Sequence, residues 1–189
     1  DDDTGDDDDT TPATSCTGSE YLCDDFEDNS FDASLWDVES GNVDEENGML
    51  KFDSDSAISS YFPTSLVSDQ YSFKLLSEIV AGDWYTVTIT NNDLGWVSID
   101  HQYGEISAFC YDIEEGGFAY GDDMSLATDT RFDLEFSQYG GHSSVFVNDS
   151  ILFSQDNCYA NDSTSDLQLI VETHSGEGVE LEKILVEEF

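Results

Sequence analysis

Acidic side chains are the groups in this sequence that are numerous and dense enough to suggest chemistry. The 189 residues contain 44 Asp and Glu against four Lys and Arg, a formal net charge of −40. Residues 31–52, FDASLWDVESGNVDEENGMLKF, place six acids around Trp36 and end in an apolar run. Paired carboxyls can act as nucleophile and general acid, carboxyl clusters can bind divalent cations, and acids on alternate strand positions simply face solvent.

Other kinds of catalytic motif are missing from the sequence. It has no G-x-S-x-G turn for a serine nucleophile and no Gly-rich loop for a phosphate group. The three histidines, His101, His142 and His174, stand far apart in the chain, and we expect each to be a surface or hairpin residue.

The acidity belongs to the whole domain and not to its first residues alone. The opening run DDDTGDDDDTT holds seven acids, which leaves 37 acids against four bases in the rest of the chain. Charge of this size repels itself in a compact state unless salt or bound divalent cations screen it. Such a field makes DNA, RNA and anionic membranes poor partners.

The cysteines and the absence of long apolar segments predict a secreted chain. No apolar run approaches the ~20 residues that a transmembrane segment needs, and we recognise no signal peptide. Cys16, Cys23, Cys110 and Cys158 form no CxxC pair, so we expect two disulfides in an oxidising compartment rather than free thiols. Of the three possible pairings we favour Cys16 with Cys23, a local loop, and Cys110 with Cys158, a long-range clamp.

The chain divides into a short acidic arm and one domain. Residues 1–15, DDDTGDDDDTTPATS, contain no large apolar side chain and cannot bury enough surface to offset the entropy of ordering. We therefore expect them to be a low-complexity arm or spacer. Residues 16–189 suit a single domain with a full core.

The elements that would position the acids are β-strands. Polar and apolar residues alternate in runs such as residues 71–80, 85–93 and 131–138, with turn residues between the runs. Residues 144–153, SVFVNDSILF, predict a hairpin because Asn and Asp at its centre tolerate the positive φ of a tight turn. About a dozen such runs predict an all-β, two-sheet antiparallel β-sandwich of the jelly-roll type.

The order of features in residues 21–52 is more specific than their composition. An acidic start, a Leu-Trp pair, a Gly and an Asn-Gly-x-Leu strand entry occupy these positions: Asp24, Asp25, Phe26, Leu35, Trp36, Gly41, Asn47, Gly48 and Leu50. The segment resembles the N-terminal signature of the concanavalin A-like lectin/glucanase (LamG-like) jelly rolls. Residues 131–153 and 179–189 resemble later strands of the same superfamily, so the resemblance spans residues 21–189.

The resemblance implies the fold of the family. The catalytic motif of its glucanases is missing from this sequence. Glucanases of this superfamily carry Glu-x-Asp-x-(x)-Glu on one strand, where alternation puts the acids on one face. No Glu in this chain is followed two residues later by Asp. We expect no enzyme activity, with a divergent glycoside hydrolase as the lesser alternative. The acids between the signature positions are interpreted as strand and turn residues that face solvent: Asp37, Glu39, Asp44, Glu45 and Glu46.

The resemblance also makes calcium a candidate cofactor. Members of the superfamily often bind a structural calcium between the N-terminal strand and an acid of the closing strand. The matching positions here are Asp25 and Glu182, and hard carboxylate oxygens suit calcium.

Aromatic residues raise the possibility of a sugar ligand. Lectin-like jelly rolls bind glycans on the concave sheet or in edge loops, where rings stack on Trp and Tyr and polar groups take hydroxyls. The candidate carbohydrate-binding residues are Trp84, Trp96, Tyr103, Tyr120 and Asp122. Trp36 matches the buried position of the family, and we favour core packing over glycan contact for Trp84 and Trp96 as well.

These features predict a secreted or cell-surface module that binds a glycan or the extracellular matrix. Two sequons, at Asn148 and Asn161, permit N-glycosylation. The alternative is a structural subunit of an extracellular filament, in which identical subunits self-assemble and a neighbour orders residues 1–15.

Overall fold

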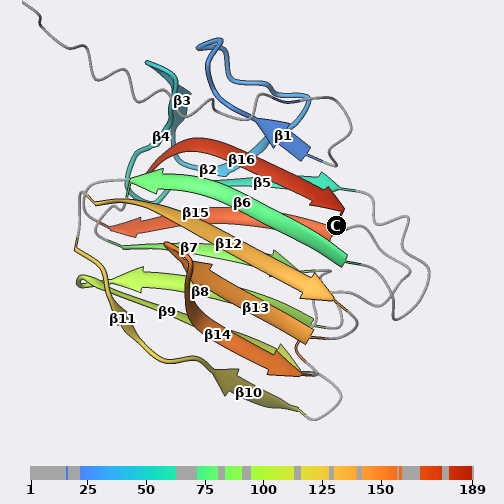
Figure 1. Cartoon of the computed structure of the whole chain (residues 1–189). Helices are drawn as coiled ribbons and strands as arrows, with labels where there is room; N and C mark the ends of the chain where they lie inside the picture. Colours follow the sequence, from blue (N-terminus) through green and yellow to red (C-terminus); the bar gives the residue numbers. More distant parts are fainter. Residues whose placement is uncertain are drawn as a thin grey trace, which may run out of the picture.

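The chain folds as a β-sandwich. The computed structural model describes residues 16, 22–62, 72–80, 84–90, 95–112, 116–127, 130–139, 142–156, 158, 167–175 and 179–188. Within these residues there are sixteen strands and two antiparallel sheets, which Figure 1 shows as stacked layers. The described part of the chain contains no helix that is long and apolar enough to cross a membrane.

We call the two layers sheet A and sheet B. Sheet A is hydrogen-bonded in the order β14-β13-β12-β6-β16-β4-β3. Strand β1 pairs with β16, which brings the N-terminal and C-terminal parts of the described chain side by side. Its strands are β1 (Leu22–Asp24), β3 (Val43–Glu45), β4 (Leu50–Phe52), β6 (Ser72–Val80), β12 (Arg131–Tyr139), β13 (His142–Val147), β14 (Ser150–Asp156) and β16 (Glu180–Glu188).

Sheet B is hydrogen-bonded in the order β10-β9-β8-β7-β15-β5-β2, and the short strand β11 pairs with β9. Its strands are β2 (Asp37–Ser40), β5 (Ala57–Phe62), β7 (Trp84–Thr90), β8 (Gly95–Gln102), β9 (Glu105–Asp112), β10 (Gly117–Tyr120), β11 (Met124–Ser125) and β15 (Leu167–Ser175).

The core lies between the sheets and follows from the alternation of the strands. In β7 the inward residues Tyr85, Val87 and Ile89 are at most 2 % exposed, while the threonines between them face outward. The inward residues of β12 and the indole of Trp36 belong to the same buried cluster. Each large side chain buried in this way stabilises the fold by about 1.5–3 kcal/mol relative to exposure.

The predicted hairpin is confirmed. β13 and β14 are joined at Asn148 and Asp149, whose φ angles are 48° and 61°. Two successive positive φ values are the geometry of a two-residue turn that matches the twist of the flanking strands. The side chain of Asn148 also accepts a hydrogen bond from the backbone N–H of Asp133 at 3.0 Å, which ties the turn to β12.

The structure contains both disulfides in the favoured pairing. Cys16 is bonded to Cys23 in β1, and Cys110 in β9 is bonded to Cys158, which follows β14. The second bond therefore links sheet B to the end of a sheet A strand. A disulfide of this kind typically stabilises a fold by about 2–4 kcal/mol.

The predicted all-β, two-sheet antiparallel sandwich is confirmed. The described strands outnumber the dozen expected because several have only three residues, as in β1, β3 and β4. Runs this short give too few alternations to be recognised in a sequence. The predicted arm, residues 1–15, lies outside the described residues and stays a prediction.

Candidate functional site

The outer face of sheet B, on the side away from the core, carries both aromatic and polar side chains. Register places residues from neighbouring strands directly opposite one another, so Thr86 of β7 faces Asp100 of β8 on one side and Glu172 of β15 on the other. Further along the same strands, Trp96 of β8 faces Tyr111 of β9. Two groups of side chains on this face differ in their chemistry.

The first group is an aromatic cluster over β8, β9 and β10. Ring centroids of Trp96 lie 5.3 Å from Phe109, 5.8 Å from Phe118 and 6.1 Å from Tyr111. The Tyr120 ring lies 5.8 Å from that of Phe109 and completes the cluster. Phe118 is 52 % exposed and Tyr120 is 72 % exposed, so the cluster presents ring surface to solvent.

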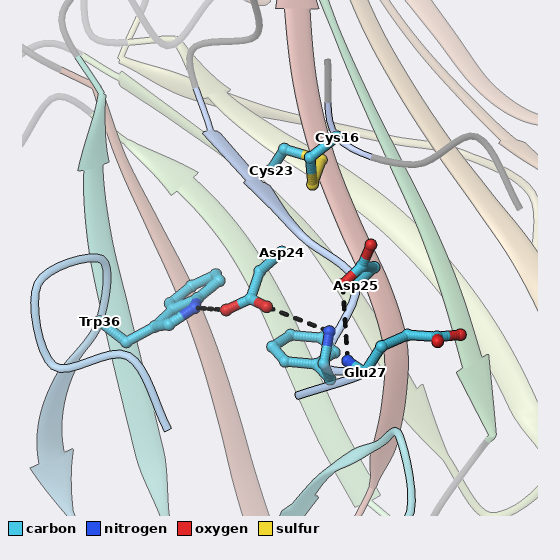
Figure 2. The surroundings of a disulfide bond; sticks show 7 residues. Cys16, Cys23, Asp24, Asp25, Glu27 and Trp36 are labelled. Carbon is cyan, nitrogen blue, oxygen red and sulfur yellow. Dashed lines mark hydrogen bonds between the residues drawn. A yellow bond between two sulfur atoms is a disulfide. The ribbon is translucent and has the colours of Figure 1, made fainter. Parts of the chain in front are cut away.

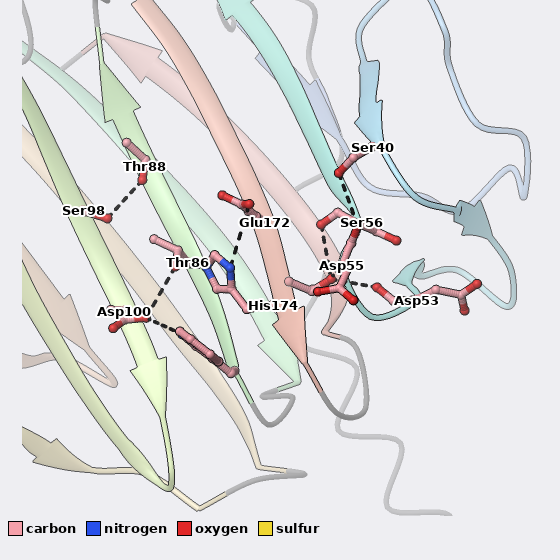
Figure 3. Close-up of polar contacts among 12 residues, drawn as sticks. Ser40, Asp53, Asp55, Ser56, Thr86, Thr88, Ser98, Asp100, Glu172 and His174 are labelled. Carbon is pink, nitrogen blue, oxygen red and sulfur yellow. Dashed lines mark hydrogen bonds and ion pairs between the residues drawn. The ribbon is translucent and has the colours of Figure 1, made fainter.

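The second group is a polar network over β7, β8 and β15, drawn in Figure 3. The indole N–H of Trp84 donates to Asp100 Oδ1 at 3.2 Å, and the Thr86 hydroxyl donates to the same oxygen at 3.4 Å. His174 Nε2 lies 2.8 Å from Thr86 Oγ1. Because the Thr86 hydroxyl donates to Asp100, it is left to accept a hydrogen bond from His174.

His174 completes the polar network on two further sides. Its ring stacks at an angle on that of Trp84, with centroids 4.7 Å apart. Its Nδ1 lies 3.8 Å from Glu172 Oε1. The network therefore holds one indole and one imidazole between two carboxyl groups, on the outer face of the sheet.

The four Lys and Arg residues lie away from this face. Lys51, Lys74, Arg131 and Lys183 belong to β4, β6, β12 and β16, which are all strands of sheet A. Lys51 pairs with Glu180 at 3.6 Å, and Arg131 pairs with Glu182. Sheet B thus has no Lys or Arg in its strands, and its outer face carries acids without a permanent positive charge beside them.

The predicted carbohydrate residues are only partly brought together. Trp84 and Trp96 are half-buried on the outer face of sheet B, so the core packing favoured for them is wrong, whereas Trp36 is buried as expected. Tyr120 joins the aromatic cluster. Tyr103 is 87 % exposed in the β8–β9 turn, with a φ of 55°.

Asp122 lies close to Tyr120, at the edge of the aromatic cluster. It is exposed and lines a hollow of about 240 Å³ between the end of β10 and the edge strand β14. Gly121 is required here because a Cβ atom would lie 2.5 Å from the carbonyl oxygen of Leu152.

The sequence prediction missed these residues of the outer face: Thr86, Asp100, Phe109, Tyr111, Phe118, Glu172 and His174.

The histidines do not all occupy surface or hairpin positions. His101 is fully buried, stacks on Tyr85 at 5.2 Å and contacts the carbonyl oxygen of Leu126 at 2.9 Å, so the surface expectation is wrong for it. Burial also raises the pKa of Tyr85 well above its usual value of 10.0, with Asp100 adding a smaller effect. The buried face of sheet B thus holds the Tyr85 ring and the His101 imidazole in contact.

His142 makes contacts in the order of a hydrolase triad. Its Nδ1 lies 2.8 Å from Asp156 Oδ1, and its Nε2 lies 2.9 Å from Ser154 Oγ. The side chain of Asp156 is 86 % exposed, whereas the Asp of a serine hydrolase triad is buried. Ser154 lies within a strand and not in a sharp turn. We therefore assign this contact no catalytic role.

A hollow of about 400 Å³ lies beside the Cys16–Cys23 disulfide, whose surroundings Figure 2 shows. Five acids line it: Asp24, Asp25, Glu27, Asp28 and Asp32. The indole N–H of Trp36 donates to Asp24 Oδ2 at 2.8 Å, and the backbone N–H of Phe26 donates to Asp24 Oδ1 at 3.1 Å. Burial raises the pKa of Asp24, and these two hydrogen bonds oppose that rise.

One acid of residues 31–52 departs from its predicted environment. Glu45 was expected to face solvent, but it is only 6 % exposed. The other four acids of this prediction are exposed as expected: Asp37, Glu39, Asp44 and Glu46. Glu45 accepts a hydrogen bond from the backbone N–H of Ser30 at 3.0 Å. Burial raises the pKa of Glu45 in spite of that hydrogen bond.

The predicted calcium ligands, Asp25 and Glu182, are engaged with other groups. The guanidinium of Arg131 pairs with Glu182, and the backbone N–H of Glu27 points at Asp25 Oδ1 from 3.5 Å. A cation at Glu182 would compete with Arg131 for the same carboxylate. In the described residues no group of three or more His, Cys, Asp or Glu side chains is arranged to hold a metal ion. These residues do not fit a calcium ion as they stand, and calcium stays a prediction.

The two sequons differ in what the structure describes. Asn148 is exposed at the tip of the β13–β14 hairpin, where its accessibility suits a modification site. Asn161 lies outside the described residues. The use of either sequon stays a prediction.

Comparison with known proteins identifies the fold. No protein-family model and no curated protein sequence matches the chain. Several solved structures match it over most of their length and most of its own.

One of these structures is the endo-β-1,3-glucanase from Pyrococcus furiosus, with a TM-score of 0.69 and 10% identity over 90% of this chain and 94% of that one. Another is SCLam, a non-specific endo-β-1,3(4)-glucanase from family GH16, with a TM-score of 0.66 and 13% identity over 88% and 89%. A third is the CBM2 module of the evolved Dit of Lactobacillus casei BL23 phage J-1, with a TM-score of 0.62 and 8% identity over 89% and 94%.

These similarities establish the fold. The chain has a concanavalin A-like jelly-roll fold, which the resemblance in residues 21–189 implied, and its structural neighbours include glucanases.

Proposed function

We propose that this chain is a secreted, non-catalytic glycan-binding module whose ligand lies on the outer face of sheet B. The observation that carries the proposal is the aromatic cluster, in which Phe118 and Tyr120 expose more than half of their surface. Sugar rings stack their C–H faces on such rings, while nearby polar groups take their hydroxyls. Both disulfides suit an oxidising, extracellular compartment.

The missing catalytic motif supports binding rather than the family mechanism of hydrolysis. No Glu in the chain is followed two residues later by Asp, so no strand carries the Glu-x-Asp-x-(x)-Glu pattern that puts the acids of the family's glucanases on one face. The fold neighbours include glucanases and a CBM2 module, so either role has precedent on this architecture.

The proposal is tested by binding to a panel of soluble polysaccharides in affinity electrophoresis. The wild-type chain should be retarded by at least one of them. A Phe118→Ala/Tyr120→Ala variant should weaken that binding about tenfold, the equivalent of ~1.4 kcal/mol of lost stacking.

The matched control is Val38→Ala, which removes an apolar side chain that is 47 % exposed on β2, at the opposite edge of sheet B from β10. It should bind as the wild type does. If no polysaccharide of the panel retards the wild type, or if both variants weaken binding equally, the proposal is wrong. Release of reducing sugar that disappears in Asp100→Asn would contradict the non-catalytic part of it.

A further inference from the structure

The polar network lies beside the aromatic cluster but offers a ligand a different chemistry. Trp96 and Asp100 are four residues apart on β8, which places them about 13 Å apart along one strand of the same face. A short oligosaccharide is long enough to touch both. The character of the polar network therefore bears on which glycan the face would prefer.

Asp100 is held in place with one oxygen committed to the protein. Trp84 and Thr86 both donate to its Oδ1, so neither of these hydrogen bonds uses Oδ2. Both donors are on the neighbouring strand β7, and their positions fix the carboxylate on the outer face. A carboxylate oriented in this way is a preorganised acceptor for a ligand donor.

Two further features of the network favour a positively charged donor. The indole of Trp84 is half-buried, with the His174 ring 4.7 Å away, and its remaining exposed surface attracts an ammonium group through the ring quadrupole. Glu172, whose side chain is 50% exposed, adds a second carboxylate on the far side of Thr86. An ammonium group near Trp84 would thus have an aromatic face and a fixed carboxylate within one network.

The distribution of charge over the two sheets points the same way. All four Lys and Arg residues are in strands of sheet A, and His174 is the basic residue of the polar network. Uronate or sulfate groups would meet acids on this face without a permanent cation to pair them. Amino groups would meet a complementary field, strengthened by the net charge of −40.

We propose that the polar network binds the ammonium group of an amino sugar, so that the preferred ligand is a glycan with free amines. This inference rests on the proposed glycan-binding function and names the ligand class of the same face. Asp100 is the principal ammonium partner, Trp84 supplies the aromatic face, and the aromatic cluster stacks a neighbouring sugar ring.

The test compares a glucosamine trimer with its fully N-acetylated counterpart by calorimetric titration. These ligands share one backbone and differ in the charge of the amine. The wild type should bind the free amine about tenfold more tightly, and Asp100→Asn should reduce that preference to about threefold or less. Asn keeps an oxygen that can accept from Trp84 and Thr86, so the face should stay folded.

The control for general attraction between a polycation and an acidic protein is Glu39→Gln. Glu39 is exposed on β2, at the opposite edge of sheet B, and accepts a hydrogen bond from the Ser59 hydroxyl at 2.6 Å. Its substitution changes the net charge by the same amount as Asp100→Asn. It should keep the wild-type preference. Titrations in about 1 M NaCl, where the Debye length falls to about 3 Å, further suppress non-specific binding.

The outcomes separate this inference from the function beneath it. If both trimers bind equally, or if Asp100→Asn and Glu39→Gln lose the amine preference to the same extent, the amino-sugar assignment is overturned while glycan binding stands. If neither trimer binds and the polysaccharide panel is also blank, both proposals are overturned.

Discussion

Two tryptophan–aspartate pairs occur in the part of the chain that the structure describes, and they have opposite surroundings. Trp36 donates its indole N–H to Asp24 at 2.8 Å from a fully enclosed position in the core. Trp84 donates its indole N–H to Asp100 at 3.2 Å from a half-buried position on the outer face of sheet B. The same two groups thus meet in the interior near β1 and on an open sheet.

The difference shows how burial decides what such a pair can do. Around Asp24 both carboxylate oxygens are taken by the protein, one by Trp36 and one by the backbone N–H of Phe26, so the pair fastens the first turn to the core. Around Asp100 the Trp84 indole and the Thr86 hydroxyl donate to the same oxygen, and the indole keeps exposed surface. The first pair is equipped for stability and the second for a ligand.

The largest expected effect is on the buried pair. Trp36→Ala should lower the free energy of unfolding by about 3–5 kcal/mol, because it leaves a large cavity in the core and an unpaired Asp24. For a chain of this size that is a fall of about 10 °C in Tm, measurable by calorimetry. A loss below about 1 kcal/mol would show that the core does not depend on this indole.

The matching change on the open pair should act on binding instead. Trp84→Ala should weaken binding of a free-amine glycan about tenfold and lower stability by about 1 kcal/mol or less. Calorimetric titration and thermal unfolding of the same sample measure both quantities. Equal losses of stability in Trp36→Ala and Trp84→Ala would remove the distinction between the two pairs.

A smaller effect concerns the pH dependence of the buried pair. Burial raises the pKa of Asp24 above 3.8, so the folded state holds this proton more tightly than the unfolded chain. The contribution of Asp24 to stability is therefore present at low pH and is lost as pH rises through its folded pKa. The Tm of Asp24→Asn should gain on the wild type between about pH 3 and pH 6, by about 2 °C at most because solvent screens this half-exposed group.

Asp32 provides a control of opposite sign. Hydrogen bonds from the side chain and backbone of Ser34 lower the pKa of Asp32 below 3.8. Its contribution to stability is present at neutral pH and is lost as pH falls through the folded pKa. Asp32→Asn should therefore lose Tm relative to the wild type as pH rises, and parallel curves for the two variants would contradict the assigned environments.

The sequence predicted those parts of the structure that depend on local pattern. Alternation along β7 and β12 shows directly which residues face the core, and Asn148-Asp149 predicts its hairpin because both residues tolerate positive φ. The fold followed from the order of the signature in residues 21–52. These features need only short stretches of the chain.

The candidate site depends on register between distant strands, which local pattern does not contain. His174 contacts Thr86 across 88 positions of sequence, and no feature near either residue predicts the contact. The aromatic cluster was closer to prediction, since the turn at Tyr103 and Gly104 sets the β8–β9 register that pairs Trp96 with Tyr111. Its completion by Phe118 requires the further register of β10.

The three indole N–H signals of the chain test directly whether a ligand binds to the outer face of sheet B. They are recorded by NMR during titration with the glucosamine trimer and its N-acetylated counterpart, and assigned with single Trp→Phe variants. We expect the Trp96 signal to shift with either ligand, the Trp84 signal to shift more with the free amine, and the Trp36 signal to stay in place. Signals that all stay in place at saturating ligand, or a shift confined to Trp36, would contradict binding to this face.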